Sequence, residues 1–316
     1  MAEVLRTKAL VVAAEGGLRL IEPDRRGAWG QAQVEWNGGE VAALLTAGRR
    51  IVAAAQSGVW LSSDGRKWEP AKGVGSTEIR CLAGDGNMVY ASDPGGALFV
   101  SHDAGGAWTE QQGLKAALES DQASVVALAL DPTNPWTVWA AASGGAILST
   151  TDAGQTWQAA GKVPAEVRAL EGSHYAGPWM EALTKVAVFA ATPSGFFKSR
   201  DAGANWESSS GGLTILGSTA MAVRRVYGQT MFLAASDQKS GGGIFRSVDY
   251  GYRWERVRDG LPEPGPEYTA LCFDKADPYV VFAGTADGRI YFCTEAGDLW
   301  HLLQSDLPPI RALVAL

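Results

Sequence analysis

Short apolar runs separated by glycine-rich turns are the main pattern along this chain of 316 residues. Within the runs, apolar residues alternate with small or polar ones at a period of two, which is typical of antiparallel strands. The clearest example has four runs in succession, at residues 125–130, 137–141, 145–149 and 156–158. No stretch of useful length has helical periodicity. The pattern predicts an all-β protein assembled from four-stranded units.

A short box recurs between these runs. In each regular copy, an aspartate is followed by glycine two positions later and by tryptophan five positions later, and serine or threonine stands two positions before the aspartate. The four regular copies begin at Asp103, Asp152, Asp201 and Asp249 and end at Trp108, Trp157, Trp206 and Trp254. Three degenerate copies run from Asp24 to Trp29, from Asp64 to Trp68 and from Glu295 to Trp300. The chain therefore contains seven units.

The spacing of the units predicts their architecture. The seven box tryptophans, from Trp29 to Trp300, are separated by 39, 40, 49, 49, 48 and 46 residues. Four strands in about 40 to 50 residues is the period of a propeller blade. We therefore expect one seven-bladed β-propeller over residues 1–316, with blades at 310–316 plus 7–36, 40–71, 77–111, 124–160, 166–210, 218–258 and 267–304.

The first blade is predicted to be shared between the two ends of the chain. Residues 310–314 have the pattern of an innermost strand, whereas residues 8–12 and 18–21 have the pattern of the second and third strands of a blade. Pairing of the C-terminal strand with the N-terminal blade would close the ring and remove the open sheet edge.

The Ser-x-Asp-x-Gly-x-x-Trp box resembles that of the Asp-box propellers, also called bacterial neuraminidase repeat (BNR) propellers, and the resemblance covers the whole chain. A single seven-bladed ring of this length is most similar to the photosystem II assembly and stability factors of that class. Xyloglucanase-type glycoside hydrolases share the repeat but place two propellers around the substrate. The resemblance implies a non-enzymatic propeller that binds a protein partner or stabilises an assembly.

The repeated carboxylates are expected to be structural. An aspartate in such a turn accepts backbone N–H bonds, glycine supplies a positive φ angle, and tryptophan packs between neighbouring sheets. A turn that recurs in every blade needs its residues in every blade, whereas catalysis needs only one site. We therefore predict neither a catalytic nor a calcium-binding role for the box aspartates.

Composition narrows the possible partners. The chain has 27 Lys and Arg against 34 Asp and Glu, which gives a formal net charge of −7. Binding of nucleic acid or of an anionic membrane without sequence specificity requires a basic surface, so we expect no nucleic-acid partner. The N-terminal apolar run is short and is preceded by Glu3, so we expect a cytoplasmic protein without direct membrane insertion.

Cysteine and histidine spacing gives no metal motif. Cys81, Cys272 and Cys293 lie within apolar runs without Cys-x-x-Cys spacing, and the three histidines are far apart. We expect buried free thiols rather than a disulfide framework. Neither a metal nor a cofactor is predicted.

The loops that enter the innermost strands, together with the turns between second and third strands, are expected to form a face around the central channel where ligands bind. Three arginines occupy equivalent entry positions, with a glutamate at an equivalent position in three blades: Arg80, Arg168 and Arg311, and Glu78, Glu166 and Glu267. Guanidinium groups there could bind a carboxylate or phosphate. Alternatively, the arginines and glutamates form a charge-balanced rim.

Sialidase chemistry is not supported by the sequence. It requires a tyrosine nucleophile with a glutamate base, and Tyr268 beside Glu267 is the one suggestive pair. Adjacent residues of a strand point to opposite faces, so these two side chains should not work together. For a glycoside hydrolase with two carboxylates, the candidates are Glu119, Asp121, Glu263 and Glu267, with solvated loop acids as the simpler interpretation.

Two irregular segments interrupt the repeat. Residues 171–183 extend the link between the first and second strands of the fifth blade and include His174, Tyr175 and Trp179. Residues 211–217 form an apolar tip that enters the sixth blade. Each segment could be a partner interface or could fold back over the ring as a plug.

Two functions from different classes remain open. The first is a binding or scaffold propeller with a protein partner. The second is a carbohydrate-active propeller, either a glycoside hydrolase or a lectin, that uses the channel face. The second requires convergent carboxylates and a tryptophan on which a sugar stacks, but Trp60 and Trp139 lie within predicted strands and are interpreted as structural.

Overall fold

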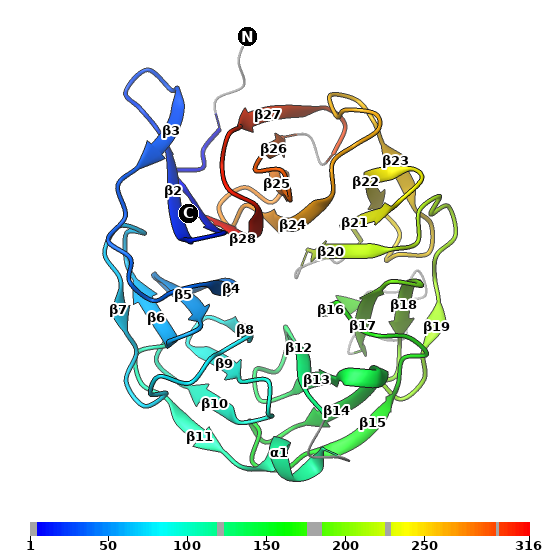
Figure 1. The fold of residues 1–316 in the computed structure, drawn as a ribbon. Coiled ribbons are helices and arrows are strands. Elements are labelled where there is room, and N and C mark those ends of the chain that lie inside the picture. Colours follow the sequence, from blue (N-terminus) through cyan, green and yellow to red (C-terminus); the bar gives the residue numbers. More distant parts are fainter. Residues whose placement is uncertain (1–4, 119–122, 176–184, 225–228, 295–296) are drawn as a thin grey trace.

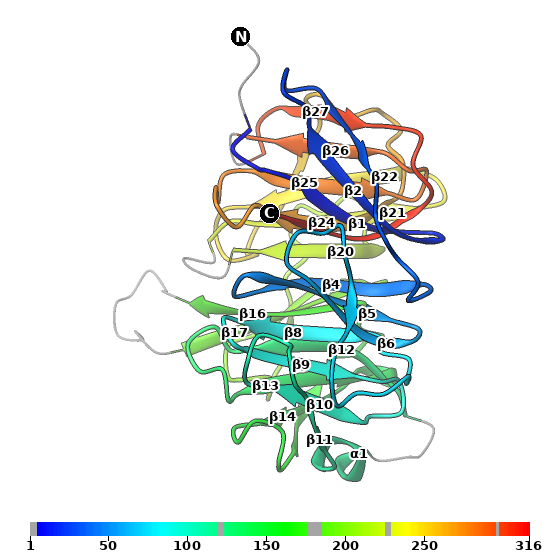
Figure 2. The same ribbon diagram turned by 90° about the vertical axis from the view of Figure 1, so that its left-hand side faces the viewer.

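Seven four-stranded antiparallel sheets surround a central channel in the computed structural model, which confirms the predicted seven-bladed β-propeller (Figure 1). The structure describes residues 5–118, 123–175, 185–224, 229–294 and 297–316. The innermost strand of each blade runs beside the channel, and the outermost strand lies on the circumference of the ring. Figure 2 shows the same ring from its side, with the strands running from one face to the other.

The strands of each blade follow one another from the channel outward. Blades 1 to 3 consist of β28 (Ile310–Ala315), β1 (Leu10–Ala14), β2 (Gly17–Pro23) and β3 (Trp29–Ala32); β4 (Val41–Ala47), β5 (Arg50–Ala55), β6 (Gly58–Ser62) and β7 (Glu69–Pro70); and β8 (Cys81–Asp85), β9 (Met88–Ser92), β10 (Leu98–Ser101) and β11 (Thr109–Gln111). Blades 4 and 5 consist of β12 (Val125–Leu130), β13 (Val138–Ala142), β14 (Ala146–Thr150) and β15 (Gln158–Lys162); and β16 (Ala169–Tyr175), β17 (Lys185–Thr192), β18 (Gly195–Ser199) and β19 (Glu207–Ser208). Blades 6 and 7 consist of β20 (Ser218–Val223), β21 (Met231–Asp237), β22 (Gly241–Ser247) and β23 (Glu255–Val257); and β24 (Tyr268–Phe273), β25 (Val281–Thr285), β26 (Ile290–Cys293) and β27 (Trp300–Gln304).

The core lies between neighbouring blades. Second and third strands are buried on both faces, as in β1 and β18, whereas the outermost β7 and β19 are exposed. This distribution explains why the inner runs are continuously apolar while the fourth strands are polar. Small residues are among the buried ones, as in Ala53–Ala55 of β5, which are fully buried.

The C-terminal strand closes the ring as predicted. β28 pairs with β1 in an antiparallel register from Leu10 opposite Ala315 to Ala14 opposite Ile310. Backbone hydrogen bonds continue beyond the ladder, because Lys8 N donates to Leu316 O at 2.9 Å. The inner edge of β1 is therefore paired, and the N-terminal blade has its full set of four strands.

The box turns have the predicted chemistry and one further feature. In the third blade, Asp103 Oδ1 accepts the N–H of Ala107 at 2.9 Å, and Trp108 Nε1 donates to Gly105 O at 2.7 Å. Gly105 has the expected positive φ of 89°, but Ala104 before it also has a positive φ, of 59°. The same pair of angles recurs at Ala153, Ala202 and Tyr250 with the glycines that follow them. The sequence pattern predicted only the glycine.

The box serine is a second anchor of the turn. Ser101 Oγ accepts the N–H of Gly105 at 2.9 Å and donates to Asp103 Oδ1 at 2.8 Å. In the seventh blade, Cys293 occupies this position, and its Sγ accepts the N–H of Gly297 at 3.0 Å. A structural role thus accounts for one of the three cysteines. The cysteines are free, and Cys81 and Cys293 are buried, but Cys272 is half-buried rather than buried as predicted.

The box aspartates should make stability depend on acid pH. Hydrogen bonds from the backbone N–H of Ala107 and of Asn205 hold the pKa values of Asp103 and Asp201 below the ordinary value of 3.8. Their stabilising contribution is therefore present above that value and lost as the pH falls through the lower folded-state pKa.

We expect Asp201→Asn to lower the free energy of unfolding by about 1 kcal/mol at pH 7, and the difference from wild type to shrink between about pH 4 and pH 2. Urea unfolding across this pH range measures both. The exposed Glu69, changed to Gln, is the control. A difference for Asp201→Asn that does not vary with pH would contradict the assignment.

Three details differ from the sequence-based expectations. A short helix, α1 (Gly113–Ala117), precedes blade 4, and a 3-10 turn, η1 (Ser143–Gly145), joins β13 to β14. Residues 171–175 belong to β16, with Glu171 opposite Phe189 and Tyr175 opposite Lys185, and not to an irregular link. The sequence did not predict that these residues continue the strand and pair with β17, because glycine, serine and histidine weaken the apolar pattern.

Candidate functional site

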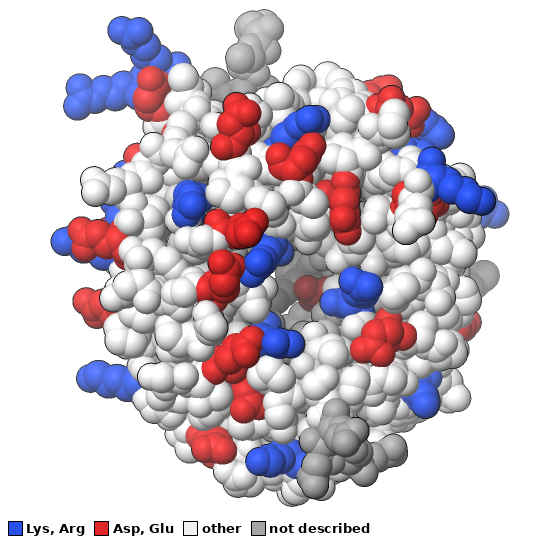
Figure 3. Space-filling model, in the orientation of Figure 1, with Lys and Arg blue, Asp and Glu red and all other residues white. Residues whose placement is uncertain are grey.

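The antiparallel order of each blade determines which loops share a face. Links into the first strands and turns between second and third strands emerge on one face, and the box turns emerge on the other. Figure 3 views the first of these faces, where basic and acidic side chains stand next to one another around the central hollow. We call this region the channel mouth and define it by the residues at the start of the innermost strands, which include Arg80, Arg168 and Arg311.

In five of the seven blades, a β-bulge leaves one residue of the innermost strand unpaired at the channel mouth. In blade 1, the register skips Arg311, so this residue is unpaired between Ile310 and Ala312. The same skip occurs at Ala42, Val126, Thr219 and Thr269. Arg80 and Arg168 hold the matching positions just before β8 and β16. The three arginines therefore belong to alternate blades, 1, 3 and 5, of one ring of seven positions.

Two of the three arginines are paired with glutamates. Arg80 Nε lies 2.9 Å from Glu78 Oε1 within the same blade, and both side chains are about half exposed. Arg311 pairs with Glu40 of the neighbouring blade. These contacts support the charge-balanced rim for Arg80 and Arg311. Exposed pairs of this kind contribute little to stability, typically about 0–1 kcal/mol, so a ligand can compete for the guanidinium groups at small cost.

Glu40 was not selected from the sequence, although a signal was present. It stands two positions before Ala42, as Glu78 stands two positions before Arg80. A search for glutamate at this offset, rather than for arginine, would have found it. The tertiary contact then links Glu40 to Arg311 across 271 residues of sequence.

Arg168 differs from the other two arginines. Its neighbour Glu166 accepts the backbone N–H of Gly144 at 2.9 Å and so fastens the turn between β13 and β14. Within the part of the chain that the structure describes, the exposed guanidinium of Arg168 has no ion-pair partner. Arg168 is therefore an arginine of the channel mouth that is available to an anionic ligand.

A depression of about 400 Å³ lies between blades 1, 2 and 3 at the channel mouth. Its walls include Glu40, Gln56, Glu78, Arg80 and Arg311. This lining combines carboxylates, guanidinium groups and an amide, a set suited to the polar groups of a peptide or a saccharide.

Glu267 and Tyr268 do not form a catalytic pair. Tyr268 is 1% exposed and packs against Tyr291 in the core between blades 6 and 7. Burial raises the pKa of its hydroxyl, which opposes formation of a phenolate nucleophile. The exposed Glu267 is the preceding residue of the chain, and its backbone carbonyl accepts the N–H of Ala286 at 2.9 Å. Tyr268 is a core residue, so its proposed ligand role at the channel mouth is wrong.

The irregular segments divide between surface and core. His174 is half-buried and is the last residue but one of β16; this strand ends on the face opposite the channel mouth (Figure 2). Trp179, Glu119 and Asp121 lie outside the described residues. In the second segment, Ile215 is 1% exposed and packs between blades 5 and 6, whereas the adjacent Leu216 is 47% exposed. The apolar tip at 211–217 is thus partly a core element.

The tryptophans outside the boxes give weak support to carbohydrate binding. Trp60 and Trp139 are 8% and 1% exposed, which confirms their structural role. Trp36 is half-buried and packs against Trp60 and Trp68. Trp136 is 48% exposed, but it follows β12 on the face opposite the channel mouth.

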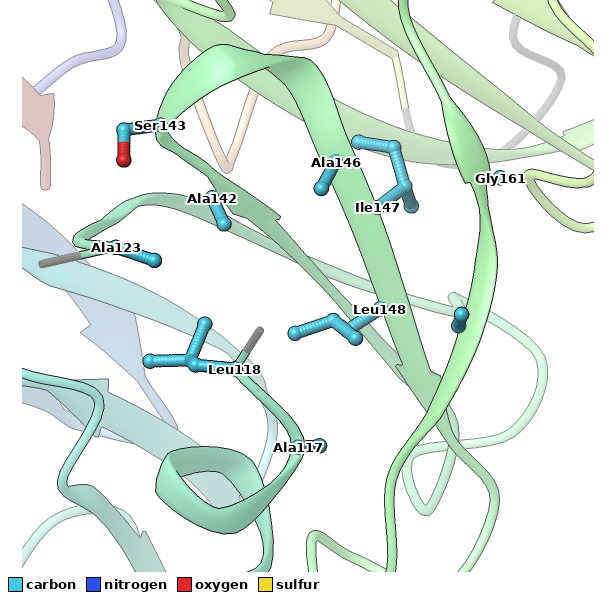
Figure 4. Close-up of a pocket in the computed structure, with 10 residues that line it drawn as sticks. Ala117, Leu118, Ala123, Ala142, Ser143, Ala146, Ile147, Leu148 and Gly161 are labelled. Carbon is cyan, nitrogen blue, oxygen red and sulfur yellow. The ribbon is translucent and has the colours of Figure 1, made fainter. Parts of the chain in front are cut away.

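An apolar pocket that the sequence did not reveal lies between the α1 segment and blade 4 (Figure 4). Its volume is about 310 Å³, and Leu118, Ile147 and Leu148 are its largest lining side chains. Among the described lining residues, Ser143 is the one with a polar side chain. The described part of the pocket can accept an apolar group and contains neither a carboxylate nor a basic side chain.

The described residues contain neither a cluster of metal ligands nor a helix that could cross a membrane. No group of three or more histidine, cysteine, aspartate or glutamate side chains is arranged to hold a metal ion among these residues. No described helix is long and apolar enough to cross a membrane.

Comparisons with known proteins support the fold. No protein-family model matches the chain, and no curated protein sequence matches it. Among solved structures, YCF48 bound to D1 peptide has a TM-score of 0.64 and 17% sequence identity, and the match covers 89% of this chain and 87% of that one. YCF48 from Cyanidioschyzon merolae has a TM-score of 0.59 and 14% identity, over 87% of this chain and 89% of that one.

A glycoside hydrolase class shares the same architecture. An ancestral GH74 enzyme has a TM-score of 0.63 and 16% identity, over 84% of this chain but only 38% of the enzyme chain. This chain therefore spans less than half the length of that enzyme. At these identities the comparisons show a shared propeller fold, of the kind found in YCF48 and in GH74 enzymes.

Proposed function

We propose that this protein is a non-enzymatic binding propeller that holds a carboxylate-bearing peptide segment of a protein partner at the channel mouth. The observation that carries the proposal is the arrangement of Arg80, Arg168 and Arg311 in alternate blades around one opening. Two of them have only exposed glutamate partners, and guanidinium groups bind carboxylates with two parallel hydrogen bonds. YCF48, which matches most of this chain, has been solved with a bound peptide.

The Asp-box resemblance supports the same function, because its single-propeller members include assembly factors. A cytoplasmic location is part of this proposal. The alternative is a carbohydrate-active propeller, as in the GH74 enzymes. The lining of the depression at Glu40 and Glu78 keeps this alternative chemically reasonable, but the buried Tyr268 offers no sialidase nucleophile.

The arginines should control binding without controlling folding. Peptides are selected from a random displayed library on the wild-type protein, and their dissociation constants are measured for wild type and for the triple variant Arg80→Gln, Arg168→Gln and Arg311→Gln. We expect at least a tenfold loss of affinity, because each charge-assisted hydrogen bond to an arginine contributes about 1.5–3 kcal/mol. The melting temperature should change little, since the replaced side chains are exposed.

The control is Arg253→Gln, an exposed arginine in the box turn of blade 6 on the opposite face. Equal affinity of the triple variant and wild type would place binding elsewhere. Failure to select any peptide, together with turnover of xyloglucan oligosaccharides by the wild type, would overturn the proposal in favour of the carbohydrate-active alternative.

A further inference from the structure

A buried lysine lies between blades 5 and 6, away from the channel mouth. Lys198 of β18 is 3% exposed, and its ammonium nitrogen has no hydrogen-bond partner within the described residues. The nearest carboxylate oxygen is Oε1 of Glu207, at 3.8 Å. The nitrogen instead lies 2.9 Å from the centroid of the Tyr252 ring. Burial of a charge without hydrogen bonds is costly, so this lysine does not stabilise the folded state in an evident way.

The other blades show that the propeller does not require a cation here. Lys198 directly precedes a box serine, and the equivalent residues of the other blades are Ile21, Leu61, Val100, Ser149, Arg246 and Phe292. Among them only Arg246 is charged, and it pairs with Asp298 and lies 3.8 Å from Glu255. Blade 7 thus supplies a carboxylate to the cation of blade 6.

The residue that faces Lys198 makes the difference. Asp298 directly follows the box glycine of blade 7, and Tyr252 directly follows the box glycine of blade 6. The interface between blades 5 and 6 and the interface between blades 6 and 7 therefore have equivalent residues facing the cation, but only the second supplies a carboxylate. Where Arg246 meets a carboxylate, Lys198 meets an aromatic face. Such a cation–π contact is weaker compensation than an ion pair with hydrogen bonds.

Lys198 also lines a pocket of about 280 Å³ on the outer part of blade 5. The other lining residues are Arg200, Asp201, Asn205, Trp206 and Glu207. Arg200 lies 3.2 Å from Glu207 and donates to the Tyr252 hydroxyl at 3.3 Å. Two basic and two acidic side chains line the pocket, so it favours a small neutral molecule over an ion.

The pKa of the Lys198 ammonium is lowered, as expected for a buried amine. Burial lowers the pKa of its ammonium from 10.5 to about 8, against the opposing effects of Glu207 and Asp249. With such a pKa, about a quarter of the amine is neutral at pH 7.5, compared with about 0.1% of an ordinary lysine. Only the neutral amine is a nucleophile, and desolvated lysines next to a second cation are a known form of activated amine.

We propose that Lys198 is a nucleophilic lysine that forms imines with short neutral aldehydes admitted to this pocket. The nitrogen lone pair adds to the carbonyl carbon, and the nitrogen gives up a proton to the Glu207 carboxylate, whose nearer oxygen is 3.8 Å away. The carbonyl oxygen takes up this proton from Glu207 and the second proton that the nitrogen loses, and it leaves as water while the C=N bond forms. One amine and one aldehyde thus give one imine and one water, without an oxidant or reductant.

Access to the nitrogen requires a small movement of Tyr252. The ring covers the nitrogen, but the Tyr252 side chain is 41% exposed and lies at the surface of a box turn. Rotation of this side chain is a local motion of an exposed group, which occurs on a fast timescale. The aldehyde then reaches the nitrogen from the pocket.

Reductive alkylation tests the proposal directly. The full chain is treated with limiting propanal and sodium cyanoborohydride, whose hydride converts each imine into a stable propylamine, and the modified lysines are quantified by peptide mass spectrometry. At pH 7.5 we expect Lys198 to be labelled at least ten times faster than the exposed Lys72 and Lys239. The advantage should decline above about pH 9, where ordinary lysines become neutral. Labelling of Lys198 no faster than of these two lysines would overturn the proposal.

Two variants use the internal symmetry of the ring as matched controls. Tyr252→Asp gives blade 6 the carboxylate that blade 7 has at Asp298, so the reactivity of Lys198 should fall to that of an exposed lysine. Arg246→Lys places a lysine at the equivalent site beside Asp298, and this lysine should not be labelled preferentially. Fast labelling of either variant at its lysine would show that the lack of a hydrogen-bonded carboxylate is not the cause and would overturn the proposal. Melting temperatures report whether each variant folds.

Discussion

Deletion of residues 310–316 is expected to abolish cooperative folding of the whole ring. These residues form the innermost strand of blade 1, and Ile310, Leu313 and Ala315 are each no more than 4% exposed. Burial of each large apolar side chain stabilises by about 1.5–3 kcal/mol, and the ladder to β1 adds hydrogen bonds worth about 0.5–1.5 kcal/mol each. The sum is comparable with the 5–15 kcal/mol that stabilises a typical domain.

The deletion also exposes the edge of β1 and an apolar face of blade 7. Leu313 belongs to the cluster between blades 7 and 1 with Phe282 and Ile290. We expect loss of the thermal transition in calorimetry and aggregation of the expressed chain, because open strand edges pair with other chains.

Two point variants in β28 distinguish the effect of losing its buried core contacts from the effect of losing its exposed charge. Leu313→Asp places a carboxylate at a 4% exposed position and should behave like the deletion. Arg311→Gln changes an exposed residue of the same strand and should leave the melting temperature within about two degrees of wild type, since surface substitutions rarely exceed 0.5 kcal/mol. A deletion that melts cooperatively near the wild-type temperature would show that the ring does not depend on this strand.

Trp300→Ala is expected to have the largest effect of any substitution at a box tryptophan. Trp300 is 1% exposed and packs edge-on against Phe232 between blades 6 and 7, and truncation of a buried tryptophan costs about 3–5 kcal/mol. Trp157 is only half-buried, so Trp157→Ala should cost about half as much or less. Urea unfolding of both variants measures the difference.

The hydrogen bonding of the indole nitrogen predicts the reverse order of cost for replacement by phenylalanine, with Trp300 the more tolerant position. Trp300 Nε1 is buried without a hydrogen-bond partner among the residues that the structure describes, whereas Trp254 Nε1 donates to Ser209 O at 2.9 Å. Trp300→Phe removes an unsatisfied donor and should cost less than Trp254→Phe, which leaves a carbonyl oxygen unpaired. Equal costs for the two phenylalanine variants would show that the hydrogen bond contributes nothing.

Sequence periodicity was sufficient to predict the ring because its signals are local. The box turn is built from residues within seven positions of one another, as from Ser101 to Trp108, and each copy marks one blade. Strand order follows from the short connections. The positive φ of Ala104 was missed, because alanine carries no signal for a left-handed conformation that the surrounding turn imposes.

The candidate site was predicted in part. Equivalent positions in the repeat correctly placed Arg80, Arg168 and Arg311 at the start of the innermost strands. The repeat could not indicate that Tyr268 is buried, since the face to which a residue next to a bulge points depends on the register. Glu40 itself could have been found from the repeat, but its pairing with Arg311 could not, because the two residues belong to different blades.

The sequence by itself determined the number of blades, the turn chemistry of each box and the closure of the ring, because these depend on residues close together in the chain or on a regular repeat. Only the tertiary structure decided which charges are paired and which are not. Arg311 meets Glu40 across 271 residues, and Lys198 meets Tyr252 where the equivalent Arg246 meets Asp298. Such pairings lie between blades, where packing rather than sequence spacing selects the neighbour.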